Sequence, residues 1–169
     1  MTSQPRRFGT IMRLIELLGD TGKIRLQKLV YFLQEGWGVS LGYDFVMYHY
    51  GPYSAQVDAD LSVLAAAGVV NISVDAGGYG YHVVPGELRP ASLAEAAMDC
   101  EEIPKVVEAF RGYDAAALEL AATIHFVHSL MPGAQRRAVV DQARALKPKF
   151  PVSSVETRYD QLVSLGLLQ

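Results

Sequence analysis

Hydrophobic and polar positions in the first part of the chain switch between helical and strand-like spacing. Apolar residues recur at helical intervals from Phe8 to Leu18, and a second apolar face runs from Leu26 to Trp37. From Phe45 to Tyr50 the side chains alternate between two sides, which predicts a strand. Gly51-Pro52 then predicts a turn. The pattern therefore indicates two helices followed by one strand.

A third helix and a hairpin follow. Ser54 is expected to cap a helix that ends at Gly68, and two alternating segments then flank Gly77-Gly78, which permits a tight turn. The order helix, helix, strand, helix, hairpin is close to that of a winged helix. We therefore predict a mainly α fold with a small β component, in which residues 1–90 form a winged-helix-like unit.

The remainder, residues 91–169, has helical patterning after a loop at Pro85 to Pro90. The expected helices begin near Ser92, run over residues 104–110, 115–131 and 134–146, and end at Leu165. Asp114 is expected to cap the helix from residue 115, and Ser153 with Glu156 has the capping-box spacing. We expect this helical half to pack on residues 1–90 in one compact domain.

Two parts of the apolar pattern recur along the chain. The third predicted helix matches the last one 98 positions later, and the first predicted helix matches residues 123–131, 113 positions later. The first copy then has 15 additional residues, roughly between Trp37 and Gly51. Two interpretations remain open: a diverged duplication into which the aromatic strand is inserted, or convergent helical patterning.

Composition and charge restrict the class of protein. Half of the 169 residues are apolar, which excludes global disorder, and no apolar run is long enough to cross a bilayer. The only cysteine, Cys100, has no partner in the chain, and with the absence of a signal-peptide pattern this predicts a soluble protein of a reducing cytoplasm. Charge is uneven: +4 over residues 1–30, -8 over residues 56–120 and +3 from residue 131 onward.

The segment from Tyr43 to Tyr53 contains four of the nine tyrosines. Because tyrosine combines a large rigid body with a polar tip, such a concentration is typical of interfaces, although a buried strand is the alternative. The residues that we predict to bind a partner are Tyr43, Tyr48, His49, Tyr50, Gly51, Pro52 and Tyr53. We further expect Tyr48 and Tyr50 to share one face of the strand, with at least one of them exposed.

Catalytic and metal-binding motifs are incomplete. His125 and His128 have the i, i+3 spacing of two metal ligands, but structural polar contacts are the stronger interpretation without a full ligand set. The Gly77 to Gly80 segment lies in a hairpin and is interpreted as a turn, not a phosphate-binding loop. We therefore predict no catalytic residues, no metal and no cofactor.

Several short motifs resemble a known family. They are Leu26 to Phe32 (LQKLVYF), Gly36-Trp37 and Tyr50-Gly51-Pro52, and they are similar to the SocA-like, or Panacea, family of bacterial antitoxin domains over about residues 9–70. Leu146 to Phe150 (LKPKF) and the terminal LGLL are more similar to the uncharacterised YwgA-like branch. The resemblance implies a protein-binding role in a toxin-antitoxin system.

The sequence therefore predicts a non-enzymatic interaction module, antitoxin-like or regulatory, with a toxin or another protein as partner and self-association as a further expectation. The alternative is a winged-helix DNA-binding regulator. The third predicted helix contains two aspartates and no Lys or Arg, so we rank DNA binding lower. Any nucleic-acid contact would use the basic residues near the N-terminus: Arg6, Arg7, Arg13, Lys23, Arg25 and Lys28.

Overall fold

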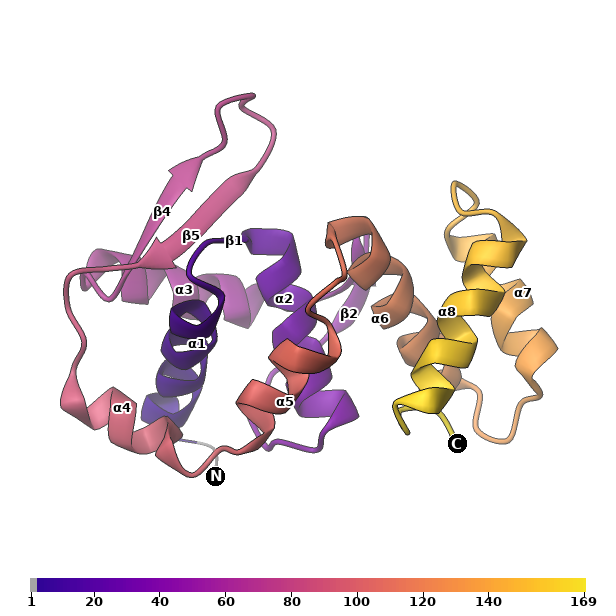
Figure 1. The fold of residues 1–169 in the computed structure, drawn as a ribbon, viewed down its shortest axis with the longest axis horizontal. Helices are drawn as coiled ribbons and strands as arrows, with labels where there is room; N and C mark the ends of the chain where they lie inside the picture. Colours follow the sequence, from indigo (N-terminus) through magenta and orange to yellow (C-terminus); the bar gives the residue numbers. More distant parts are fainter. Residues whose placement is uncertain (1–2) are drawn as a thin grey trace.

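A computed structural model describes residues 3–169, and it is mainly helical with two small antiparallel sheets (Figure 1). In chain order the elements of the first part are α1 Gln4–Leu18, β1 Thr21–Gly22, α2 Lys23–Tyr31, a π-helical turn η1 Phe32–Gly36, β2 Val46–Tyr48, β3 Gly51–Tyr53, α3 Ala55–Ala66, β4 Val70–Val74 and β5 Tyr81–Pro85. The second part contains α4 Ala91–Met98, α5 Glu102–Ala109, α6 Ala115–Leu130, α7 Arg136–Leu146 and α8 Val152–Ser164.

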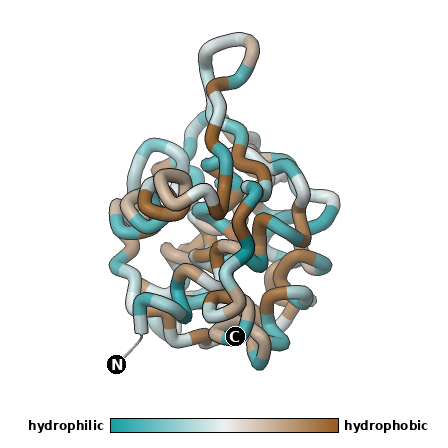
Figure 2. Tube along the Cα trace, turned by 90° about the vertical axis from the view of Figure 1, so that its left-hand side faces the viewer, coloured by the Kyte–Doolittle hydropathy of each residue, from teal (hydrophilic) through white to brown (hydrophobic). Residues whose placement is uncertain are grey.

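The larger sheet has the strand order β1-β5-β4, and both pairings are antiparallel. Val83 of β5 lies opposite Thr21 on one side and Ile72 on the other. The β4–β5 hairpin turns around Gly78, whose φ of +75° is the left-handed conformation that glycine tolerates. Its tip projects from the body of the molecule (Figures 1 and 2).

The smaller sheet is the β2–β3 hairpin, in which Met47 lies opposite Pro52. Our prediction of one strand followed by a Gly51-Pro52 turn is therefore wrong in detail. The turn lies at His49 and Tyr50, and Gly51 and Pro52 begin the returning strand. Proline is compatible with this position because β3 pairs with β2 on one side only.

Buried apolar residues from both parts of the chain form one cluster. Ile11 of α1 and Phe32 of η1 belong to it together with Ile124 of α6 and Leu162 of α8. In Figure 1, α6 lies between the N-terminal elements and the α7–α8 pair. Among residues 3–169, no helix combines the length and the apolar character needed to cross a bilayer.

Helix ends test three of the sequence predictions. The Asp114 side chain accepts a hydrogen bond of 2.7 Å from the Ala117 N–H, which confirms the cap of α6. Ser54 precedes α3, but its hydroxyl makes no capping bond; its backbone groups bond to Gln27 instead. The predicted capping box of Ser153 and Glu156 is wrong, because α8 already begins at Val152, after Pro151.

Candidate functional site: a cleft lined by tyrosines

A cavity of about 390 Å³ lies between the two hairpins and the start of α2. We call it the tyrosine cleft, because five tyrosines line it. Its lining consists of Gly22, Lys23, Ile24, Arg25, Gln27, Lys28, Tyr48, Tyr50, Gly51, Tyr53, Asp58, Tyr79, Gly80, Tyr81 and Ala115. Residues far apart in the sequence therefore share one concave surface, which is the usual form of a ligand-binding site.

The exposed tyrosines come from both hairpins. Tyr48 and Tyr50 are each more than half exposed, which confirms the prediction that at least one of them is accessible, and both line the tyrosine cleft. The expectation that they share one face of a strand is wrong, because β2 ends at Tyr48 and Tyr50 lies in the turn. Tyr81 is also more than half exposed, and Tyr79 is 99% exposed. Exposed aromatic side chains around a cavity can stack on a planar ligand without first disrupting the core.

Tyr43 belongs to a different environment. It is 4% exposed, and its hydroxyl donates a hydrogen bond of 2.8 Å to the Asp60 carboxylate. Burial, followed by this contact with Asp60, raises the pKa of Tyr43 well above its usual range. The aromatic segment that the sequence presents as one cluster is thus divided between the core and the tyrosine cleft.

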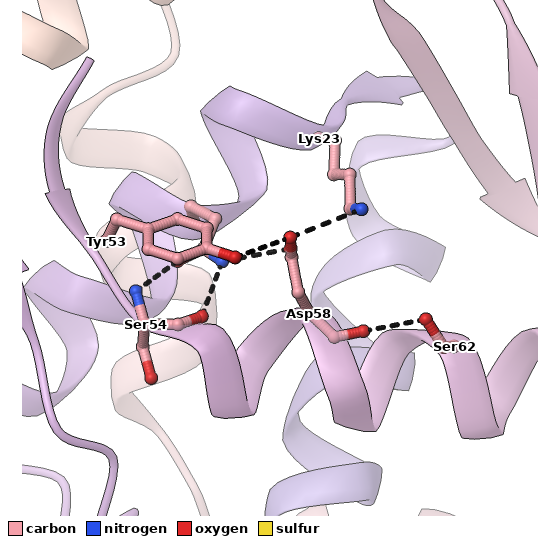
Figure 3. A network of polar contacts seen from close by, with 6 residues as sticks. Lys23, Tyr53, Ser54, Asp58 and Ser62 are labelled. Carbon is pink, nitrogen blue, oxygen red and sulfur yellow. Dashed lines mark hydrogen bonds and ion pairs between the residues drawn. The ribbon is translucent and has the colours of Figure 1, made fainter. Parts of the chain in front are cut away.

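Asp58 of α3 provides a fixed carboxylate in the lining of the cleft (Figure 3). It accepts hydrogen bonds from the Tyr53 hydroxyl at 2.9 Å and from the Gln27 amide at 3.0 Å, and the Lys23 ammonium lies 3.3 Å away. Burial, and then the hydrogen bond to Asp58, raise the pKa of Tyr53. Three neighbours therefore define the orientation of one carboxylate.

Two glutamine side chains hold the ends of the segment that contains the β2–β3 hairpin. The amide of Gln34 bonds to both the N–H and the C=O of Tyr43, at 2.9 and 2.8 Å. Gln27 bonds to both backbone groups of Ser54 in the same way, at 3.1 and 2.8 Å. Because each amide replaces a missing strand neighbour, the buried backbone polar groups at these two positions remain satisfied.

Buried lysines hold the middle of the same segment. Lys28, which is 2% exposed, donates to the Pro52 carbonyl at 2.6 Å, and Lys147 donates to the His49 carbonyl at 2.6 Å. The buried Glu119 carboxylate lies 2.9 Å from the Lys147 ammonium and 2.8 Å from that of Lys149. Burial is the main cause that lowers the pKa of Lys28 to about 8.

The six predicted nucleic-acid contacts do not form one basic surface. Lys23, Arg25 and Lys28 line the tyrosine cleft, although Lys28 is buried. The other three lie on α1, where Arg7 pairs with Asp60 at 3.0 Å, Arg13 pairs with Glu16 at 3.4 Å, and Arg6 is exposed.

His125 and His128 make separate contacts. The Nδ1 atom of His125 lies 2.7 Å from the buried Tyr31 hydroxyl, and Nε2 of His128 lies 3.1 Å from the Gln169 carbonyl. Burial lowers the pKa of His125 to about 4. Among the residues that the structure describes, no three His, Cys, Asp or Glu side chains come together as a metal-binding group.

Tyr79, Tyr81 and Asp58 line the cleft but are absent from the predicted site residues. The sequence places Tyr79 and Tyr81 in a predicted hairpin, and it places Asp58 in the third predicted helix, where its charge argues against DNA binding. A tyrosine between glycines in a tight turn was an available signal, since such a ring has nothing local to pack against. Nothing in the sequence joins these residues to Tyr48 and Tyr50, because that proximity depends on how the two hairpins are placed.

Comparison with known proteins bears on function. No protein-family model matches the chain. The chain is 26% identical over 187 aligned positions to a protein of Thermus aquaticus named DNA ADP-ribosyl glycohydrolase. The match covers all of this chain and 50% of the relative, so the chain spans about half the length of the protein that it resembles.

This similarity corrects the functional prediction. The expected non-enzymatic interaction module, with its alternative of a DNA-binding regulator, is contradicted because the similar protein is named as a hydrolytic enzyme. The resemblance to SocA-like antitoxin domains and the expected protein partner or self-association stay predictions.

Proposed function

We propose that this chain takes part in the hydrolysis of ADP-ribosyl groups from DNA and that the tyrosine cleft holds the ADP-ribosyl nucleotide. The observation that carries the proposal is the combination, in one cavity, of exposed aromatic rings, basic residues at a helix start and a fixed carboxylate. The relative's name supports the reaction class.

The lining suits the parts of such a ligand. Tyrosine rings such as Tyr48 and Tyr81 stack on bases of any sequence, because every base has a π-face. The start of α2 lines the same cavity, with Lys23 and Arg25 in its first turn. Backbone N–H groups at a helix start and basic side chains both favour phosphate oxygens, so this wall suits the pyrophosphate.

Asp58 suits the reacting bond. Hydrolysis of a glycosidic bond passes through a transition state in which the sugar carries positive charge, and a carboxylate with a defined orientation stabilises that charge. Because Gln27, Tyr53 and Lys23 hold Asp58 in place, little reorientation is needed during the reaction. We therefore assign to Asp58 the electrostatic role in hydrolysis.

The test uses the 169-residue chain and a DNA oligonucleotide that carries one ADP-ribosyl group, with the released ADP-ribose measured by mass spectrometry. Asp58→Asn should lower the rate by roughly a hundredfold or more, the usual effect of removing one charge-stabilising group. Asp141→Asn is the matched control, because Asp141 is an exposed carboxylate on α7. Its rate should equal that of the unaltered chain.

Two other results would change the assignment. No release from an oligonucleotide that a known glycohydrolase cleaves would refute catalysis by this chain. Binding of that oligonucleotide without release would confine the cleft to substrate recognition, and the hydrolytic residues would then belong to the part of the relative that this chain does not cover.

We also propose a winged-helix relationship for the unit that contains α1 to β5. The sheet order β1-β5-β4, with β1 between α1 and α2, supports it. A duplication of the three-helix unit is supported by the matching ends of α3 and α8, because Gly68 and Gly166 have φ values of +75° and +73°. Val57 and Val155, which correspond in the repeat, are both fully buried.

A further inference from the structure

The β2–β3 hairpin supplies Tyr48, Tyr50 and Tyr53 to the tyrosine cleft, yet it is a two-stranded sheet of three residues per strand. Such a short hairpin is marginally stable alone, so contacts outside it must determine where its tyrosines lie. Gln27, Gln34 and Lys28, from α2 and η1, provide three of these contacts.

A further contact comes from a distant part of the chain. Lys147, immediately after α7, donates a hydrogen bond to the carbonyl of His49, which lies in the turn of the hairpin. Among the hydrogen bonds and ion pairs of residues 3–169, this is the one that joins the segment after α6 to the β2–β3 turn. Glu119 of α6 lies 2.9 Å from the Lys147 ammonium and fixes its position.

We propose that Lys147 is a positioning residue for the tyrosine cleft: its buried ammonium, held by Glu119, fixes the turn of the β2–β3 hairpin and so makes the geometry of the cleft depend on the C-terminal helices. Ligand binding in the cleft and the docking of α7 are then linked, because each favours the same position of the hairpin. The expected effect on ligand binding rests on the proposed function, whereas the contact with the hairpin does not.

The surroundings of Lys147 make a clean substitution feasible. Removing one partner of a buried ion pair is usually severe because the other charge is left unpaired. Here Glu119 keeps the Lys149 ammonium at 2.8 Å, so Lys147→Met leaves this carboxylate with a partner. The methionine side chain also fills a volume similar to that of the apolar part of the lysine side chain.

The experiment measures hydrogen–deuterium exchange of backbone amides in the full chain. Loss of a hydrogen bond from a charged donor should speed exchange over residues 46–53 on the order of tenfold in Lys147→Met. Exchange over residues 70–85, the other hairpin, should not change. Lys147→Arg, which keeps a charged donor, should restore much of the protection.

Lys105→Met is the matched control, since Lys105 is an exposed lysine on α5 that forms an ion pair with Glu101, one helical turn earlier in the chain. It should leave both hairpins unchanged. With the ADP-ribosylated oligonucleotide, Lys147→Met should raise KM on the order of tenfold and change kcat less, because the residue orients a wall of the cleft and does not contact the reacting bond.

Two outcomes would overturn the proposal. One is unchanged exchange over residues 46–53 in Lys147→Met. The other is faster exchange across the whole chain in both Lys147→Met and Lys147→Arg, which would make Lys147 a general requirement of the fold. If the unaltered chain releases no ADP-ribose, the proposed function fails, and the exchange measurements still decide the role of Lys147.

Discussion

Lys28 offers a sharp test of the electrostatics beneath the cleft. Its side chain is buried, and its ammonium donates to the Pro52 carbonyl. Burial outweighs the attraction of Glu119 and lowers the pKa of Lys28 from 10.5 to about 8. In the unfolded chain this lysine regains its ordinary pKa, so folding releases a proton when the pH lies between the two values.

The sign and size of the effect follow from this difference. Between pH 8 and pH 10.5 the unfolded state binds more protons at Lys28 than the folded state, so the free energy of unfolding rises with pH. Each unit of pH above 8 contributes about 1.4 kcal/mol, so the gain between pH 7 and pH 9.5 is about 2 kcal/mol. Lys28→Met abolishes the titration, so the free energy of unfolding of the unaltered chain, relative to that of this variant, should rise by that amount between pH 7 and pH 9.5.

Guanidinium denaturation at pH 7 and pH 9.5 measures this difference, because other titrating groups affect both proteins alike. Lys105→Met serves as the control; its exposed side chain should produce no comparable dependence on pH. A constant difference between Lys28→Met and the unaltered chain at both pH values would refute the reasoning, because Lys28 would then titrate equally in the folded and unfolded states.

Three further predictions concern stability. Because burial lowers the pKa of His125 to about 4, the unfolded state binds more protons than the folded state below pH 6.5. The free energy of unfolding should therefore fall by roughly 1.5 kcal/mol between pH 6.5 and pH 5. In His125→Gln, denaturation at the two pH values should show a smaller fall. Gly51→Ala should lower the free energy of unfolding by about 2 kcal/mol or more, since φ is +86° and a Cβ would lie 3.1 Å from the Thr123 hydroxyl. Gly133→Ala, which is also at positive φ but in open space, should lower it by about 1 kcal/mol. Equal losses in the two variants would contradict the argument from crowding. Replacing both Tyr48 and Tyr50 by Ala should shift the free energy of unfolding by less than about 1 kcal/mol in thermal melts, because both rings are exposed; global unfolding would show that they belong to the core.

The local elements of this chain could be predicted from its sequence because their determinants are local. Helical apolar spacing located α1, α2, α6 and α7, and Gly68, which has a φ of +75°, marked the end of α3. Asp114 correctly predicted the start of α6, because its capping hydrogen bond joins residues only three positions apart. Errors arose where a local signal competed with a distant partner: the backbone of Ser54 bonds to Gln27, and the Pro52 carbonyl accepts from Lys28.

The tyrosine cleft required the tertiary structure. The sequence identified Tyr48 and Tyr50 as accessible aromatic residues, but the same cavity is also lined by Tyr79 and Tyr81, about thirty positions away in the chain. No pattern of residues specifies that the two hairpins face one cavity, because their relative placement depends on the packing of α1, α2 and α3 beneath them. The buried charges are likewise assembled by folding, since Glu119 and Lys147 meet through the packing of α7 on α6. Local periodicity thus determines which elements form, whereas the long-range packing of those elements decides which side chains share a site.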